Sequence, residues 1–238
     1  MSGRLTPEGA VPGSPGALER ISRRFDLAWN EVGVGVSRLL LPEIADPAAY
    51  IEQRMASDQA GGGELPYWTK LWPAAMVMAQ FALRLAKGQG PLLELGAGLG
   101  LPGLVAAAGG RQVILTDLDP DALEFARAAV EKNALTGRVE VMALDWEDPP
   151  AGLGGFSTIL GAEVLYHPPL YPRLVELLGE LLAPGGTAFI SHEQRPFPIA
   201  FFELAGARFS VRRTTSRIGG GEDATTVYLY ALTAKQAA

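Results

Sequence analysis

The stretch LLELGAGLGLPGL, residues 92–104, places glycines at 96, 98, 100 and 103 directly behind a short apolar run that contains Glu94. A short apolar run that leads through a glycine turn into a helical segment is typical of the strand–turn–helix units of a parallel α/β sheet. Glycine is required where the backbone is left-handed or approaches a ligand closely, because it has no Cβ atom. The stretch therefore predicts a strand, a tight turn beside a ligand site, and a helix over 101–108.

The same alternation of strands and helices continues toward the carboxyl end. The strands expected from short apolar runs lie at 91–95, 112–117, 139–144, 157–164 and 186–191, and further helices are expected at 120–134 and 170–182. Residues 208–216 and 225–233 are also strand-like, and with no helix between them they predict neighbouring antiparallel strands. Together these elements predict an α/β, Rossmann-like three-layer sandwich with a mostly parallel seven-stranded sheet and a reversed terminal strand.

Length and composition predict one main domain behind an N-terminal arm. A chain of 238 residues with 48% hydrophobic content can build one large core. Residues 1–20, rich in glycine and proline, are expected to form a disordered leader. Residues 21–65 are expected to form an arm, with either a short strand pair or an extended segment that ends at Pro42. A helix capped by Asp46 and starting at Pro47 should follow. The main domain is then expected over residues 66–238.

Composition also excludes several classes of site. The chain has no cysteine, which rules out disulfides, a cysteine nucleophile and thiolate metal sites, and is compatible with a cytoplasmic location. With only two histidines, His167 and His192, we expect no metal centre. The net charge of −6 argues against nucleic-acid binding, and no apolar run is long enough to predict a membrane span. We interpret the cluster Arg208, Arg212, Arg213 and Arg217 as a solvated strand edge, with a local basic patch as the alternative.

The glycine turn admits two interpretations of its ligand. Gly98, Gly100 and Gly103 satisfy the GxGxxG pattern of dinucleotide sites, in which backbone amides hold a pyrophosphate. Glu94 with Gly96, Gly98 and Gly100 forms instead an acid-x-Gly-x-Gly-x-Gly pattern. A carboxylate beside the turn disfavours pyrophosphate and suits a ligand that carries positive charge, such as S-adenosylmethionine. A tight turn without any ligand is the third possibility.

The next two strands predict further contacts to a nucleoside. Asp117 ends one strand where a ribose would present its two hydroxyls, whereas Asp119 is expected to cap the helix that begins at Pro120. Asp145 is a candidate acceptor for an adenine amino group. Trp146 is a candidate cover for the adenine face, with a role in the core as the alternative.

Several motifs, taken in order, resemble those of class I, seven-β-strand S-adenosylmethionine methyltransferases. They are LLELGAGLGLPGL, LTDLDPDALEFARAAVEKN, LDW, ILGAEVLYHPPLYPRLVELL and LLAPGGTAFIS. PYWTKLWPAA upstream and the acid-x-x-aromatic motif EVLY resemble the protein lysine methyltransferase branch, methyltransferase family sixteen. The resemblance covers about residues 64–195.

The resemblance implies a role for individual residues of this chain. The implied cofactor contacts are Gly96, Ala97 and Gly98 at the turn, Asp117 at the ribose, Trp146 at adenine, Ala162 in the pocket wall and Trp72 at the methionine end; Glu94, Gly100 and Asp145 join them from the reasoning above. Glu163 and Tyr166 fall on the acid-x-x-aromatic motif and are the implied catalytic residues. Glu163 stands where many relatives have aspartate, so its carboxylate lies one methylene farther from the backbone.

The resemblance implies a cytoplasmic S-adenosylmethionine-dependent enzyme that methylates the nitrogen of a protein lysine side chain. Methyl transfer to a small molecule, a nicotinamide-cofactor oxidoreductase and an inactive Rossmann-like binding module are the alternatives. Neither a nucleic acid nor a membrane is an expected partner. His167 is more readily explained as an exposed loop residue than as a base, and His192 and Glu193 are candidates for the rim of the site.

Overall fold

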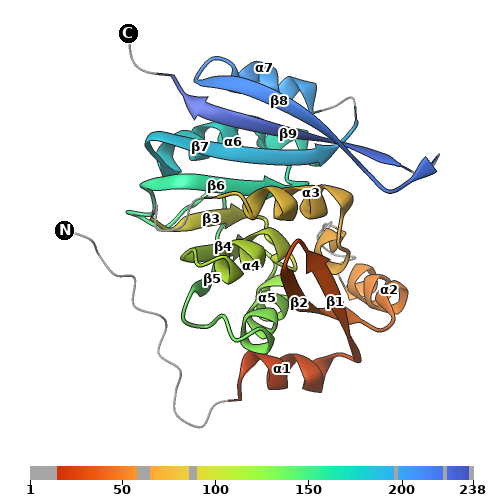
Figure 1. The fold of residues 1–238 in the computed structure, drawn as a ribbon. Helices are drawn as coiled ribbons and strands as arrows, with labels where there is room; N and C mark the ends of the chain where they lie inside the picture. Colours follow the sequence, from red (N-terminus) through yellow and green to blue (C-terminus); the bar gives the residue numbers. More distant parts are fainter. Residues whose placement is uncertain (1–14, 58–64, 86–89, 196–197, 222–223, 236–238) are drawn as a thin grey trace.

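A computed structural model describes residues 15–57, 65–85, 90–195, 198–221 and 224–235. Its centre is a seven-stranded sheet with the strand order β5-β4-β3-β6-β7-β9-β8, shown in Figure 1. The strands are β3 (Leu92–Leu95), β4 (Val113–Asp117), β5 (Val139–Ala143), β6 (Phe156–Ala162), β7 (Leu182–Glu193), β8 (Phe209–Ile218) and β9 (Thr225–Ala234).

Strand directions confirm the predicted fold class. Strands β3 to β7 pair in parallel, whereas β9 runs antiparallel to both of its neighbours, β7 and β8. Strand β9 is therefore the reversed strand, and β8 forms the edge of the sheet. Arg212, Arg213 and Arg217 lie on this edge strand and are exposed, as expected for a solvated edge.

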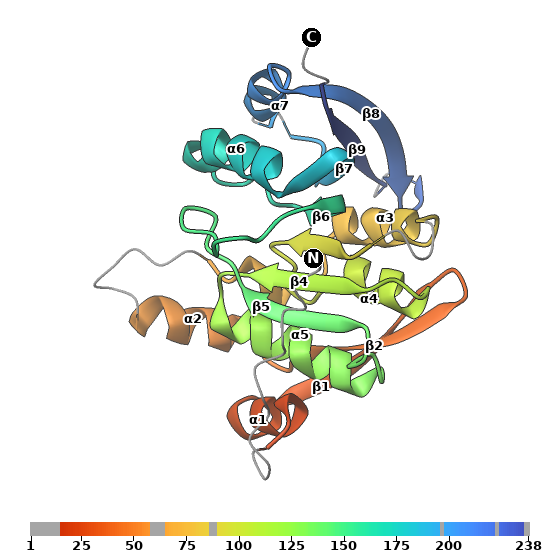
Figure 2. The same ribbon diagram turned by 90° about the vertical axis from the view of Figure 1, so that its left-hand side faces the viewer.

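Helices cover both faces of the sheet. On one face lie α3 (Pro73–Ala82), α4 (Leu101–Ala108) and α5 (Pro120–Lys132); on the other lie α6 (Tyr171–Leu181) and α7 (Ile199–Ala205). Figure 2 shows α3 and α4 on the opposite side of the sheet from α6 and α7. Because side chains alternate along a strand, Leu92 packs into the core on the α4 side, whereas Leu93 and Leu95 pack into the core on the α6 side. The same alternation directs Glu94 toward α4.

The N-terminal arm shares the core on the α4 side. Strands β1 (Leu27–Val34) and β2 (Ser37–Ile44) form an antiparallel pair, which decides between the two possibilities that the sequence leaves open. Helix α2 (Pro47–Ser57) follows, and the Asp46 carboxylate accepts the Ala49 N–H at 3.0 Å, which confirms the predicted cap. Val34 and Leu39 of the hairpin are buried in the same cluster as Phe125 of α5.

The N-terminus departs from expectation, because a helix, α1 (Ala17–Arg24), stands where the sequence predicts the end of a disordered leader. Residues 1–14 lie outside the described residues, so the correction concerns residues 17–20. The Glu131 carboxylate of α5 accepts the N–H groups of Ala17 and Leu18 at 2.8 and 2.9 Å. This cap is more than one hundred residues away in the chain, so no local pattern could reveal it.

Helix α7 lies between β7 and β8. Helix α7 was not predicted; it has seven residues and no side-chain cap, and it buries Phe201 and Ala205. Among the helices in the described ranges, none combines the length and apolar character that crossing a membrane requires. The same ranges contain no group of three or more histidine, aspartate and glutamate side chains arranged to hold a metal ion.

Candidate active site

The glycine turn after β3 has the backbone that its sequence predicts. Gly96, Gly98 and Gly100 have φ angles of 55°, 52° and 72°, in the left-handed region that side chains disfavour. Gly100 is the residue before α4, so the turn delivers the chain directly into that helix. The Gly98 N–H donates to Asp117 Oδ2 at 2.8 Å, which ties the turn to the end of the neighbouring strand β4.

Glu94 holds this turn from inside the sheet. Its Oε2 accepts the Gly103 N–H in the first turn of α4 at 2.7 Å, and the residue is 1% exposed. Burial raises the pKa of Glu94 to about 8; the Gly103 N–H opposes this rise and Asp117 adds to it. The Glu94 carboxyl group therefore binds a helix N-terminus, and its direct contact with a cationic ligand stays a prediction.

Asp117 and Asp119 have different surroundings. Asp117 accepts the N–H groups of Gly98 and Asp119, and burial raises its pKa although both bonds lower it. Asp119 accepts the N–H groups of Asp121 and Ala122 and is the N-cap of α5, as predicted. Asp117 is thus the acid held against the glycine turn.

The loop after β5 brings Asp145 and Trp146 to the same edge of the sheet. Asp145 Oδ1 accepts the Glu147 N–H at 2.9 Å. Trp146 is half-buried against the core on the α6 side, and its carbonyl accepts the Arg173 Nε–H at 2.7 Å. Trp146 therefore packs against the core, as the alternative interpretation of the sequence expected.

Glu163 occupies an unusual backbone position immediately after β6. Its φ is 58°, a left-handed conformation that costs a non-glycine residue about 1–3 kcal/mol. Its Oε1 accepts the Glu193 N–H at 2.6 Å, and its Oε2 pairs with Arg195 Nη2 at 3.2 Å. Burial raises the pKa of Glu163, and the Glu193 N–H and Arg195 lower it. The carboxylate is held from two sides, which is typical of a positioned functional group.

Three aromatic rings lie close to one another, and Arg195, the partner of Glu163, reaches one of them. The Tyr67 ring lies 5.2 Å from the Tyr166 ring and 6.3 Å from the Trp72 ring, and Trp72 Nε1 donates to the Tyr67 carbonyl at 2.9 Å. Two cations face the Trp72 ring, Lys70 Nζ at 4.7 Å and Arg195 Cζ at 5.9 Å from its centroid. We call Tyr67, Trp72 and Tyr166 the aromatic mouth.

The glycine turn, the acids Glu94, Asp117 and Glu163 and the aromatic mouth line one cavity of about 610 Å³, within the range of small-molecule sites. Its wall includes every predicted site residue: Trp72, Glu94, Gly96, Ala97, Gly98, Gly100, Asp117, Asp145, Trp146, Ala162, Glu163 and Tyr166. His167 also lines it, whereas His192 does not: it is 3% exposed and stacks on Tyr230, 5.4 Å away, so the expectation that it reaches the rim is wrong.

Sequence reasoning missed Arg54, Tyr67 and Lys70 of the cavity wall. Arg54 reaches the cavity from α2, where Arg54 Nη2 pairs with Asp119 Oδ2 at 2.7 Å. A contact across 65 residues leaves no local signal. Tyr67 and Lys70 lie within PYWTKLWPAA, so the motif itself pointed to them.

Comparisons with known proteins agree with this geometry. Residues 58–205 match the profile of the family described as lysine methyltransferase. The chain is 35% identical over 138 residues to EEF1A lysine methyltransferase 3 of Mus musculus, covering 56% of this chain and 59% of that protein. It is 37% identical over 109 residues to the histone-arginine methyltransferase METTL23 of Xenopus laevis, covering 43% and 46%. The chain thus spans about half the length of these relatives.

Solved structures share the fold. The N-methyltransferase NodS from Bradyrhizobium japonicum WM9, in complex with S-adenosylhomocysteine, superposes with a TM-score of 0.57 at 15% identity, over 80% of this chain and 100% of that one. At this identity the likeness concerns the fold alone. The profile match spans more than half of the sequence, and the chain therefore belongs to the lysine methyltransferase family.

Proposed function

We propose that this protein is an S-adenosylmethionine-dependent methyltransferase that methylates the nitrogen of a protein lysine side chain. The observation that carries the proposal is the single cavity that joins the glycine turn and Asp117 to Glu163 and the aromatic mouth. The strand order determines how a ligand would be oriented in this cavity, because β4 and β5 lie on one side of β3 and β6 lies on the other. A nucleoside near β4 and β5 would direct its reactive end toward β6.

The residues of the cavity fit the cofactor. Carboxylates of Asp117 and Asp145 are acceptors suited to ribose hydroxyls and an adenine amino group, and Trp146 offers a ring beside them. Gly96 and Gly98 lie in the cavity wall without side chains, so a ligand can approach the backbone. When bound, the cofactor supplies an activated methyl group on a positively charged sulfur.

The aromatic mouth supports a cationic acceptor. Trp72 already faces two cations of the chain, and a lysine ammonium from a substrate would find the same ring surface. The positive charges of Lys70 and Arg195 beside this ring favour loss of the ammonium's proton, which gives the neutral amine that methyl transfer needs. Tyr166, at the surface, is suited to guide the amine, and Glu163 to orient it by a hydrogen bond.

The alternatives predict different ligands. A nicotinamide enzyme would need a pyrophosphate at the glycine turn, where the Gly98 N–H already donates to the Asp117 carboxylate and the Gly103 N–H to Glu94, so these two amides are not available to a phosphate. A binding module would not require the strained Glu163 backbone at the mouth. One relative is described as a histone-arginine methyltransferase, so the assay for the methyl acceptor must distinguish arginine from lysine.

We also propose a cytoplasmic location, to be tested by cell fractionation.

Calorimetry on the full chain with S-adenosylhomocysteine, and with NADH as the control, tests the cofactor. A ligand raises the melting temperature only if it prefers the folded state, so thermal shift gives an independent reading. We expect binding of S-adenosylhomocysteine and none of NADH. Binding of NADH alone would support the oxidoreductase, and binding of neither would contradict the proposal.

A further inference from the structure

The chain carries a lysine of its own at the aromatic mouth. Lys70 is exposed, lines the cavity, and places its Nζ 4.7 Å from the centroid of the Trp72 ring. The residue lies in extended backbone between the short helix η1 (Tyr67–Thr69) and α3. Its amine thus lies against the same ring that is proposed to receive the substrate amine.

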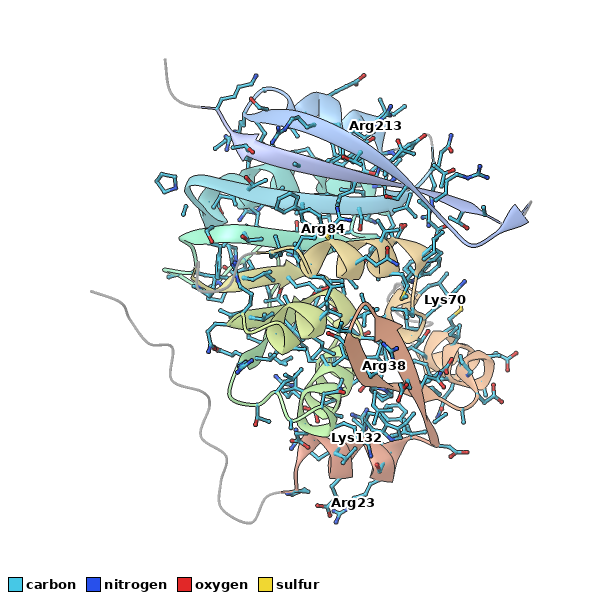
Figure 3. The ribbon with its side chains drawn as sticks, in the orientation of Figure 1. Arg23, Arg38, Lys70, Arg84, Lys132 and Arg213 are labelled. Carbon is cyan, nitrogen blue, oxygen red and sulfur yellow. The ribbon has the colours of Figure 1, made fainter. Side chains whose placement is uncertain are left out.

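Among the lysines in the described residues, Lys70 alone lines the cavity. The sequence contains four: Lys70, Lys87, Lys132 and Lys235. Lys87 lies outside the described residues. Lys132 Nζ also faces a tryptophan, Trp29, at 5.2 Å, but it does not line the cavity, and Lys235 Nζ donates to the Gly206 carbonyl at 2.6 Å. Figure 3 shows Lys70 and Lys132 well separated on the molecule.

The side chain of Lys70 is free to move from the ring into the cavity. Within the described residues, the Trp72 ring is the contact that the structure gives its ammonium, with no carboxylate partner. A cation–π contact at an exposed site is worth about 0.5–1 kcal/mol, so leaving it costs little. Glu163 and Tyr166 line the same cavity, so the four-carbon side chain of Lys70 has open space on their side of the ring.

We propose that Lys70 is a self-methylation site, modified by the cavity that it lines. This inference rests on the proposed methyltransferase function. The Lys70 ammonium first releases a proton to water at the open mouth. The lone pair of the neutral Nζ then forms a bond to the methyl carbon of the bound cofactor, while the carbon–sulfur bond breaks and its electron pair stays on sulfur. A methylammonium and a neutral thioether result, so charge is conserved.

Peptide mass spectrometry of the full chain tests this site. After incubation with S-adenosylmethionine, cleavage at arginine isolates residues 55–84, in which Lys70 is the single lysine. We expect added methyl mass on this peptide, at a rate per molecule that does not change on serial dilution. Lys70→Arg should abolish the modification, whereas Lys132→Arg, which removes the other tryptophan-facing lysine, should leave it intact.

Amine labelling provides a reading that needs no turnover. Acetic anhydride should acetylate Lys70 several-fold more slowly when S-adenosylhomocysteine fills the cavity, while Lys132 reacts at an unchanged rate. Unmodified Lys70 in protein that binds the cofactor and methylates another acceptor would overturn the self-methylation site and leave the proposed function intact. Failure to bind S-adenosylhomocysteine would overturn both. A rate that falls on dilution would show transfer between molecules and overturn the proposed geometry.

Discussion

Among single residues, Asp117 contacts the glycine turn and is also the proposed ribose ligand. Asp117→Ala removes the acceptor of the Gly98 N–H and the proposed ribose ligand together. We expect S-adenosylhomocysteine binding to weaken by about 1.5–3 kcal/mol, the usual loss for a hydrogen bond to a charged group. Calorimetry on the folded variant measures this loss. Asp148→Ala, an exposed acid outside the cavity wall, is the control; equal affinity in both variants would remove Asp117 from the site.

Glu94 links the site to the pH dependence of stability. Its pKa is raised to about 8 by burial, so the folded state binds this proton more tightly than the unfolded state. Stability is therefore full below the unfolded pKa and is lost as pH rises toward 8, by at most about 1.4 kcal/mol per pH unit. Glu94→Gln keeps an acceptor for the Gly103 N–H and should remove this loss.

Chemical denaturation of wild type and Glu94→Gln between pH 5 and pH 8 measures the effect. The unfolding free energy of the wild type should fall relative to the variant across this window. Parallel curves for the two proteins would mean that Glu94 is ionised in the folded protein at all of these pH values. A loss of cofactor affinity without a change in these curves would favour the direct contact that the sequence predicts.

Glu163 is the second acid whose protonation bears on the site. Arg195 and the Glu193 N–H lower the pKa of Glu163, whereas burial and the Glu193 carboxylate raise it. Arg195→Gln removes the favourable charge, so the Glu163 pKa should rise. The acidic limb of the kcat/KM profile should then move to higher pH, with activity recovered in alkaline buffer. Arg213→Gln, on the edge strand, should leave the profile unchanged; a uniform loss at every pH in Arg195→Gln would contradict this role.

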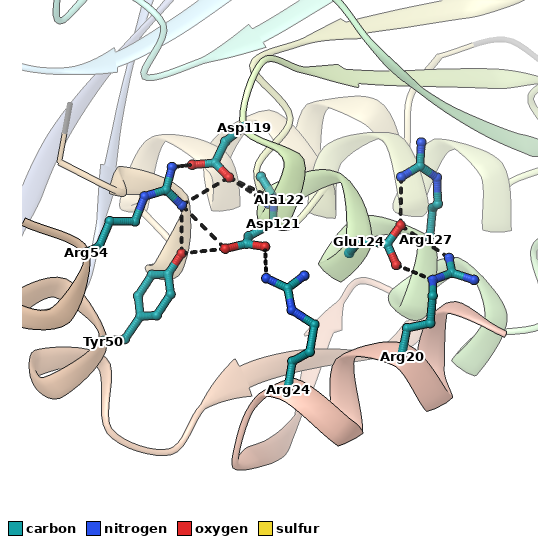
Figure 4. Close-up of polar contacts among 9 residues, drawn as sticks. All are labelled: Arg20, Arg24, Tyr50, Arg54, Asp119, Asp121, Ala122, Glu124 and Arg127. Carbon is teal, nitrogen blue, oxygen red and sulfur yellow. Dashed lines mark hydrogen bonds and ion pairs between the residues drawn. The ribbon is translucent and has the colours of Figure 1, made fainter. Parts of the chain in front are cut away.

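At the scale of elements, α2 is held over the N-terminus of α5 by a polar network, shown in Figure 4. Arg54 Nη2 pairs with Asp119 at 2.7 Å, and Arg54 Nη1 donates to the Tyr50 hydroxyl at 2.8 Å. That hydroxyl donates to Asp121 at 3.0 Å, and burial raises the pKa of Tyr50 to about 12, so it stays protonated. The network joins the arm to the cavity wall.

Arg54→Met should loosen this contact. Because the pair with Asp119 is partly buried, we expect a loss of about 1–2 kcal/mol in unfolding free energy, between the values for exposed and buried pairs. Hydrogen exchange should show faster opening of α2. Arg23→Met, which removes an exposed ion pair with Glu19 in α1, should change little. Unchanged exchange in α2 would show that apolar packing alone holds the arm.

At the scale of the whole molecule, local patterns predicted the parallel sheet, and long-range contacts decided the rest. Strands β3, β4 and β6 carry short apolar runs, and the glycine turn carries its own conformational signal, so the fold and the gathering of these residues at one cavity follow from sequence. Glu131 caps the N-terminus of α1, and Asp119 holds Arg54 at the cavity wall. Such partners lie many residues apart, and no periodicity records them. His192 was wrongly expected at the rim of the site because it lies near the end of a strand. Its side chain instead stacks on Tyr230 of the neighbouring strand, a contact that the local sequence does not reveal.

Methyl-labelled S-adenosylmethionine reveals which molecules this chain methylates. The full chain is incubated with a cell lysate and a low concentration of the labelled cofactor, and the labelled species are identified by mass spectrometry, with Asp117→Ala as the variant of weakened cofactor binding. We expect label on lysine side chains of one or a few proteins, and much weaker label with the variant. Label confined to arginine, to small molecules or to nothing at all would contradict it.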